Sequence, residues 1–132
     1  ARDFLVREAT RATSAAPTYF ECAFVSSQSD VGYPLIDGGI IANNPTMCAY
    51  AEAVSSFDKK AKDMAILSVG TGYANIEYEY EKVKDWDLLE WPAPLIDMMM
   101  TGVSEIVHYQ LQQMFKATQA EQQYLRLDMT LG

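Results

Sequence analysis

Asp37 is the residue of this sequence best placed to do chemistry. It follows a short apolar run at 33–36 and precedes Gly38 and Gly39. In α/β sheets, reacting groups gather at the carboxyl ends of strands, where an aspartate can orient a hydroxyl group or remove its proton. The glycines would let the backbone turn sharply and let another segment come close. The pattern therefore indicates a general base held between a strand and a turn.

A turn without a catalytic role is the simpler interpretation of the same residues. Asp-Gly-Gly between two apolar runs is a common turn signal. On the pattern alone, this interpretation of residues 37–39 is the more frequent one. The catalytic interpretation needs support from elsewhere in the chain.

The nucleophile that such a base would serve is not evident. None of the serines lies in a Gly-x-Ser-x-Gly motif, which exposes a nucleophile on a strand-to-helix turn. His108 is a lone histidine in a helical pattern, and a packed or surface role is favoured over that of a base. The glycines at 70–72 lack the spacing of the phosphate-binding motifs, and a turn is favoured there. The sequence thus offers a base without an obvious partner.

Composition and charge exclude several classes of function. The chain has 132 residues, enough for one domain or part of one, with 18 acidic and 10 basic side chains and a net charge of −8. Nucleic-acid binding needs clustered Lys and Arg, so nucleic acid is excluded as a partner and strong docking on anionic lipid is disfavoured. A neutral lipid substrate remains compatible with this charge. Cys22, Cys48 and His108 have no metal-ligand spacing, and both cysteines are expected to be buried free thiols.

Nothing in the sequence directs the chain into or across a membrane. No apolar run approaches the roughly 20 residues of a spanning helix, and no signal peptide is visible. We expect a soluble protein whose compartment is open, with the cytoplasm slightly favoured. The chain starts at Ala1 and opens directly on a helical pattern, which we interpret as a cut edge.

Two helices are expected in the first half of the chain. Asp3 is expected to cap the first, which reaches Ala16 before a proline disfavours helical backbone. Asn44 is expected to cap the second, with Pro45 at the first helical position and an end near Ser56.

The second half is expected to add a parallel sheet and a long helix. The apolar run at 64–69 is continuous rather than alternating, which is typical of a strand covered on both faces. An apolar stripe predicts a helix from Pro94 to Lys116. The other expectations are extended structure at 18–25, a loop at 26–30, a buried strand at 33–36, a surface excursion at 75–91 and a strand at 123–129. This alternation of helix and strand predicts an α/β layered architecture.

Two groups of side chains have two interpretations each. Met98–Met100 are core or adaptable lining for an acyl chain, and core is favoured. Tyr and Glu alternate over 77–81. This segment could contact a partner or form a half-exposed strand or loop, and the second interpretation is favoured.

Five segments, in this order, carry a resemblance to a known family. They are "EATRATSAAPTYF" (8–20), "LIDGGIIANNPTMCAYAEA" (35–53), "ILSVGTG" (66–72), "DMMMTGVSEIVHYQLQQMF" (97–115) and "YLRLD" (124–128). Together they closely resemble the carboxyl-terminal half of the patatin-like phospholipase family. Each segment alone is a weak signal, whereas the complete order at these spacings is specific.

The resemblance implies a fold and a partial active site. It implies a layered α/β/α patatin-like architecture with a mostly parallel central sheet, of which residues 1–132 are the carboxyl-terminal part of a single domain. Proteins of the family are lipid acyl hydrolases with a Ser-Asp dyad, so Asp37 would be the catalytic acid/base and Gly38 and Gly39 its scaffold. The family's glycine-rich oxyanion loop and Gly-x-Ser-x-Gly serine lie upstream of the matched region. This chain alone is therefore expected to be inactive.

The resemblance also implies partners. These are a lipid ester substrate, the missing amino-terminal half of the domain and a transient contact with a membrane surface, and no metal or organic cofactor is required. Half of a parallel sheet would leave an unpaired edge and an uncovered apolar face, so we expect association. Two alternatives stay open: a non-catalytic lipid- or protein-binding member of the same fold, and an inactive structural fragment.

Overall fold

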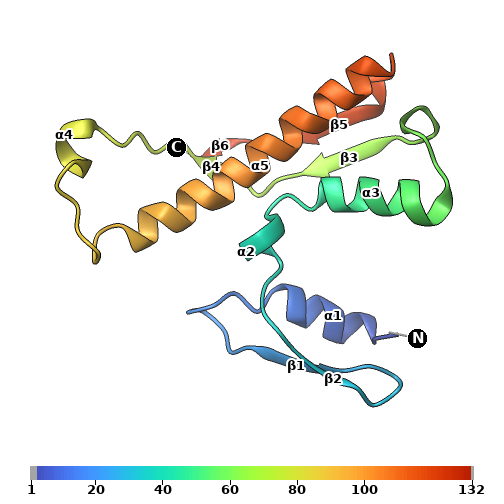
Figure 1. The fold of residues 1–132 in the computed structure, drawn as a ribbon, viewed down its shortest axis with the longest axis horizontal. Coiled ribbons are helices and arrows are strands. Elements are labelled where there is room, and N and C mark those ends of the chain that lie inside the picture. Colours follow the sequence, from blue (N-terminus) through green and yellow to red (C-terminus); the bar gives the residue numbers. More distant parts are fainter. Residues whose placement is uncertain (1–2, 132) are drawn as a thin grey trace. The chain divides into compact units, whose positions relative to one another are not determined.

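The computed structural model describes residues 3–131. The chain divides into two compact units, Ala1–Asn43 and Asn44–Gly132, here called the first and second units. Figure 1 shows the order of their elements along the chain.

The first unit packs one helix on a β-hairpin. Its elements are α1 (Val6–Thr13), β1 (Ala23–Ser26), β2 (Gly32–Leu35) and the short α2 (Gly39–Ala42). Strands β1 and β2 are antiparallel, with Ala23 opposite Leu35 and Ser26 opposite Gly32. Side chains of a strand alternate between its faces, and β1 places one face in the core. That core contains Ala12, Ala15, Ala23 and Val25, with Phe4 packed against it.

Several local expectations for the first unit are wrong. Helix α1 begins at Val6 and has no side-chain cap, and the backbone carbonyl of Asp3 instead accepts the Gln28 N–H at 2.8 Å. Helix α1 also ends at Thr13, earlier than predicted. The expected extended structure begins only at Ala23, because the preceding segment turns with Thr18 in the left-handed region at φ 74°.

The predicted buried strand at 33–36 exists, but it is not buried. Leu35 and Ile36 are both exposed, because the buried side chains of the hairpin come from β1. Cys22 and Cys48 are free thiols as predicted, but both are exposed rather than buried.

The second unit contains the parallel strand pairs and the long helix. Its elements are α3 (Thr46–Phe57), η1 (Ala61–Asp63), β3 (Ile66–Val69), β4 (Tyr73–Ala74), α4 (Tyr80–Val83), α5 (Pro92–Ala117), η2 (Glu121–Gln123), β5 (Tyr124–Leu127) and β6 (Thr130–Leu131). Strand β3 pairs with β5 and β4 pairs with β6, both in parallel. The α/β architecture predicted from the alternation of elements is confirmed, and so are the helix at 94–116, the strand at 123–129 and the excursion at 75–91.

The core of the second unit lies between the β3–β5 pair and the helices. Leu111 and Phe115 of α5 are fully buried beside Tyr124 of β5. Tyr50 of α3 and Ile66 of β3 pack against this cluster, so both helices cover the same face of the strands. Figure 1 shows α5 running along the strand pair. Only the second half of α5 contributes fully buried side chains; Leu95, Ile96 and Met99 in its first half are exposed.

The other face of the β3–β5 pair is bare in the described part of the chain. We call it the outer sheet face: Leu67, Val69, Leu125 and Leu127, which are 62%, 68%, 54% and 51% exposed. Strand β3 was predicted to be covered on both faces. This prediction is wrong for residues 3–131, because the helices of the second unit pack on one face only.

The two parallel pairs form one ladder with a break between them. Gly70 N–H donates to the Leu127 carbonyl at 2.8 Å, and Tyr73 N–H donates to the Met129 carbonyl at 3.0 Å. Between these bonds Gly72 has a φ of +94°, which favours glycine. Residues 70–72 link β3 to β4 without a turn or a bend, so the predicted turn at this position is wrong.

Candidate functional site

Asp37 lies in the short connection between β2 and α2. Its backbone N–H donates to the Ala15 carbonyl at 3.0 Å, which ties the connection to the segment after α1. Its carboxylate turns toward the start of α2, where Oδ1 accepts the Gly39 N–H at 2.7 Å. The side chain is half-buried. The backbone and one carboxylate oxygen of Asp37 are thus both fixed by the first unit.

The two glycines after Asp37 differ in their surroundings. A Cβ atom on Gly39 would lie 3.0 Å from Asp37 Oδ1, whereas one on Gly38 would meet Thr13 Oγ1 at an ordinary 3.5 Å. Gly38 has φ −64° and ψ −20°, which any residue adopts. A side chain at position 39 would therefore force the Asp37 carboxylate to shift by a few tenths of an ångström, whereas one at position 38 would not.

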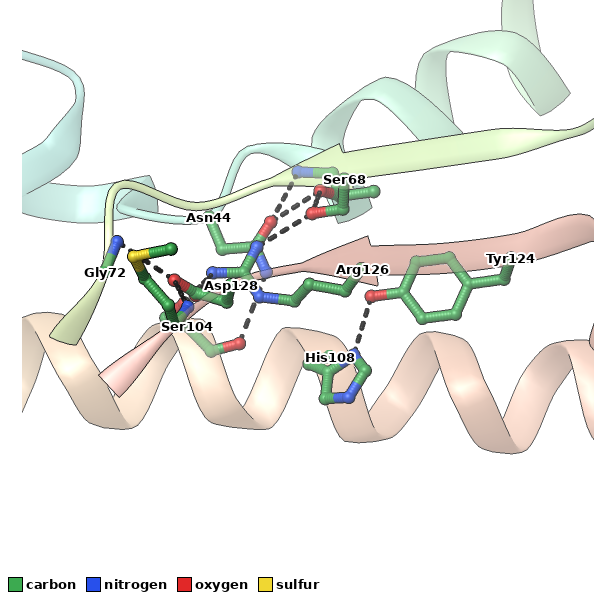
Figure 2. A network of polar contacts seen from close by, with 10 residues as sticks. Asn44, Ser68, Gly72, Ser104, His108, Tyr124, Arg126 and Asp128 are labelled. Carbon is green, nitrogen blue, oxygen red and sulfur yellow. Dashed lines mark hydrogen bonds and ion pairs between the residues drawn. The ribbon is translucent and has the colours of Figure 1, made fainter. Parts of the chain in front are cut away.

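A buried polar group in the second unit surrounds one arginine, and we call it the Arg126 network (Figure 2). It joins β5 to α5, β3 and the start of α3. Arg126 donates to Ser68 Oγ at 2.8 Å and to Ser104 Oγ at 2.9 Å, and it pairs with Asp128. The Arg126 and Asp128 side chains are only 10% and 18% exposed. The guanidinium charge is thus neutralised and hydrogen-bonded where water has little access.

The hydrogen bonds between the hydroxyl groups of the network have a defined donor and acceptor. Thr46 Oγ1 donates to Asn44 Oδ1 at 2.5 Å and lies 2.8 Å from Ser68 Oγ. Because a hydroxyl has one proton, Ser68 must donate to Thr46 while it accepts from Arg126. Asn44 Oδ1 also accepts the Thr46 N–H at 3.2 Å. The N-cap of α3 is Pro45, without a side-chain cap, so the prediction of Asn44 as cap and Pro45 as first helical residue is wrong by one position.

Asp128 also binds the link between β3 and β4. Its Oδ1 accepts the Gly72 N–H at 3.0 Å and the Met129 N–H at 3.1 Å. Burial raises the pKa of Asp128, but the hydrogen bonds from Met129, Arg126 and Gly72 outweigh it and hold this pKa below its usual range. The carboxylate therefore stays charged beside the arginine.

His108 has a structural partner rather than a catalytic one. Its Nδ1 lies 2.9 Å from the Tyr124 hydroxyl, and the two rings are tilted with centroids 5.6 Å apart. Burial raises the pKa of Tyr124 above its ordinary value, with Arg126 acting in the opposite direction. This arrangement agrees with the packed role favoured from the sequence.

Comparison with known proteins gives a consistent result. A scan against protein-family models finds no match. Patatin-like protein 1 of Arabidopsis thaliana is 31% identical over 148 aligned residues, which cover 96% of this chain and 36% of that protein. Patatin-like protein 3 of the same plant is 33% identical over 138 residues, covering 88% of this chain and 32% of that protein.

The chain belongs to the patatin-like family. It spans about a third of the length of the curated relatives it matches. One relative is named "Probable inactive patatin-3-Kuras 1", from Solanum tuberosum; it is 30% identical over 133 residues, which cover 87% of this chain and 35% of that protein. The relatives that this chain matches therefore include a protein whose name describes it as probably inactive.

The predicted site residues and the Arg126 network lie in different units of the patatin-like chain. Asp37, Gly38 and Gly39 belong to the first unit, and the Arg126 network belongs to the second. Reasoning from the sequence missed this network. Its one signal was Ser68, the single polar residue of an otherwise apolar strand.

Residues 3–131 contain neither a metal-binding cluster nor a membrane-spanning helix. No group of three or more His, Cys, Asp or Glu side chains in that range is arranged to hold a metal ion. Within the same range, no helix has both the length and the apolar character needed to pass through a bilayer.

Proposed function

We propose that this chain is part of a lipid acyl hydrolase in which Asp37 is the acid/base partner of a nucleophilic serine. The serine and the oxyanion-binding glycine loop would be supplied by polypeptide outside these residues, since the chain contains no Gly-x-Ser-x-Gly motif. The substrate class is a lipid ester, and the reaction needs no metal or organic cofactor.

The observation that supports this proposal is the orientation of the Asp37 carboxylate. The Gly39 N–H fixes Oδ1 at 2.7 Å. A carboxylate has two oxygens, and this contact uses only one, so the proposal assigns Oδ2 to the serine proton. Membership of the patatin-like family supports the same assignment.

The proposed reaction has two steps. The serine hydroxyl gives its proton to Asp37 and attacks the ester carbonyl, and backbone N–H groups hold the oxyanion. Asp37 then passes the proton to the departing alkoxide, which leaves an acyl-serine. In the second step Asp37 takes a proton from water as the water attacks the acyl group, and returns that proton to serine as the fatty acid departs.

Replacement of Asp37 tests this function in the longer protein that carries this chain. Asp37→Asn should lower hydrolysis of a chromogenic acyl ester by at least about 100-fold, because a general base typically contributes that much. Asp30→Asn is the matched control: it removes the same charge in the first unit, at a left-handed position that Asn tolerates. Turnover within a few-fold of wild type for Asp37→Asn would refute the dyad role of Asp37.

A non-catalytic lipid- or protein-binding member is the second candidate function. The name of the Solanum tuberosum relative favours it, because a chain this similar occurs in a protein described as inactive. The two candidates differ in one readable feature, a Gly-x-Ser-x-Gly serine ahead of this region. A longer protein that lacks this serine and hydrolyses no acyl ester would support the second candidate.

A further inference from the structure

An open apolar groove lies in the second unit where the surface excursion meets α5. It has a volume of about 500 Å³ and is lined by Leu88, Trp91, Pro92, Leu95 and Ile96. We call it the α5 groove. All of its lining side chains are apolar, so it suits a hydrocarbon ligand and offers no polar recognition from its walls.

Two leucines beside the α5 groove project into solvent. Leu88 and Leu89 are 90% and 88% exposed, the highest values among the exposed large apolar side chains of the described residues. The Leu89 N–H donates to the Asp87 carboxylate at 2.7 Å, and Glu90 accepts the Asp87 N–H at 3.0 Å. These bonds close a compact turn that presents the leucines at its tip.

An aromatic cluster stands next to the α5 groove. The Trp86 and Trp91 rings meet edge to face with centroids 5.2 Å apart, and Tyr78 meets Trp86 at 5.8 Å. Tryptophan is favoured at the boundary between water and hydrocarbon, because its ring is apolar and its N–H is polar. Aromatic faces also attract quaternary ammonium groups.

The charge around the groove is negative. Six carboxylates against two lysines give residues 77–90 a net charge of −4 (Glu77, Glu79, Glu81, Asp85, Asp87 and Glu90 against Lys82 and Lys84). Both lysines are already paired, Lys82 with Glu79 at 3.0 Å and Lys84 with Glu81 at 2.6 Å. This surface repels anionic lipid and is complementary to a head group whose outermost charge is positive.

We propose that the α5 groove docks this protein on a zwitterionic lipid surface with choline head groups, with Leu88 and Leu89 entering the acyl region. The tryptophan pair would then lie at the depth of the head groups, near their ammonium ions. Exposed apolar side chains supply the binding free energy, and the acidic rim supplies the selectivity against anionic lipid. This docking goes beyond the proposed acyl hydrolysis and is measured without turnover.

The chain carries its own reporter for this contact. It has two tryptophans, Trp86 and Trp91, and both belong to the aromatic cluster beside the groove. With vesicles of phosphatidylcholine brominated on its acyl chains, we expect a blue shift and quenching of tryptophan emission. Vesicle flotation that recovers the chain without any quenching would place the contact elsewhere and overturn the proposal, as would absence of flotation.

A pair of double variants separates the α5 groove from the outer sheet face. Leu88→Ser with Leu89→Ser should weaken partitioning into phosphatidylcholine vesicles by about tenfold or more. Leu125→Ser with Leu127→Ser, which also removes two exposed leucines, should keep at least half of the binding. Circular dichroism checks that both variants are folded; if either is not, quenching of the wild-type chain decides. Equal loss in both variants would overturn the proposal.

Two further outcomes concern other occupants of the α5 groove. Binding to phosphatidylglycerol vesicles as tight as to phosphatidylcholine at low salt would contradict the charge argument, because repulsion is strongest there. Sedimentation without lipid that shows a dimer, dissociated by the Leu88→Ser and Leu89→Ser changes, would assign the groove to a second copy instead. Weak binding to phosphatidylglycerol and no such dimer are the expected results.

Discussion

Gly38 and Gly39 are neighbours, but a methyl group would meet different surroundings at each. At Gly39 it would lie 3.0 Å from the Asp37 carboxylate oxygen, and at Gly38 it would meet Thr13 at an ordinary 3.5 Å. The carboxylate must move by a few tenths of an ångström only in the first case. Substitutions at these two positions therefore distinguish an effect on the orientation of the Asp37 carboxylate from a general effect of a side chain in the turn.

Gly39→Ala should lower ester hydrolysis by the longer protein by about tenfold, because small displacements of a reacting group are costly. Gly38→Ala should leave the rate within about twofold of wild type. Both rates are measured on the same chromogenic ester, with melting temperatures as a check on folding. Equal rates for the two variants would show that the Gly39 contact does not position the carboxylate.

Asp128 is the titratable group of the Arg126 network whose charge matters most for stability. Its pKa is lowered in the folded chain, so its contribution is fully present above the unfolded pKa of about 3.9. That contribution is lost as the pH falls through the lower folded pKa. A group whose pKa is raised in the folded chain would show the opposite pH dependence, with a stability contribution that is lost as the pH rises.

Asp128→Asn should reduce the free energy of unfolding by about 1–2 kcal/mol at pH 7, because it leaves the partly buried Arg126 without its counter-charge. The gap between wild type and variant should shrink as the pH falls below about 4. Urea unfolding at pH 7, 4, 3 and 2 measures this. Asp58→Asn, at an exposed left-handed position, is the control and should show no such gap.

Helix α5 is one element with two environments. Leu111 and Phe115 in its second half are 0% exposed, whereas Leu95 and Ile96 in its first half are 47% and 53% exposed. The sequence shows one apolar stripe along the whole helix. Periodicity identifies the apolar face of a helix, but it does not tell which part of that face has a partner.

Phe115→Ala should lower the free energy of unfolding by about 3–5 kcal/mol, because it opens a cavity in the core. Ile106→Ala should cost less than about 1 kcal/mol, since its side chain is already mostly in water. Chemical denaturation of both variants measures the two values. A similar cost at the two positions would mean that Ile106 is packed as tightly as Phe115.

Much of the fold could be predicted from the sequence, since helices and strands follow local periodicity. Helix α5 illustrates this, because its apolar stripe at helical spacing predicted an element close to the observed Pro92–Ala117. Asp3 and Ser68 show where local reasoning fails. Asp3 uses its backbone carbonyl for Gln28, and Ser68 meets an arginine 58 residues away. Partners distant in sequence leave no local pattern. The role of Asp37 came from the order of motifs and stays a prediction.

The chain as a whole covers about a third of the curated relatives it matches, and its outer sheet face is bare in the described residues. Four apolar side chains on two paired strands form a flat surface that water solvates poorly. An edge strand beside it offers unpaired backbone groups to another chain. Both features favour contact with more polypeptide.

The chain by itself should therefore associate at micromolar concentration. Sedimentation velocity over a dilution series measures this, and Leu125→Ser with Leu127→Ser should shift the distribution toward monomer because it removes half of the apolar surface. The same shift should follow when the longer protein covers this face. A wild-type chain that stays monomeric throughout the series would contradict this expectation.

The Arg126 network also bears on the order in which the second unit folds. Its bond between Arg126 and Ser68 joins residues 58 apart, and the bond between Asn44 and Ser104 joins residues 60 apart. Phe115 and Tyr124, by contrast, meet across a short connection. Closing a long loop costs more entropy than closing a short one, so nearby contacts form early and distant ones late. We therefore expect the guanidinium group to stay hydrated through most of folding and to lose its water only when β3 joins β5.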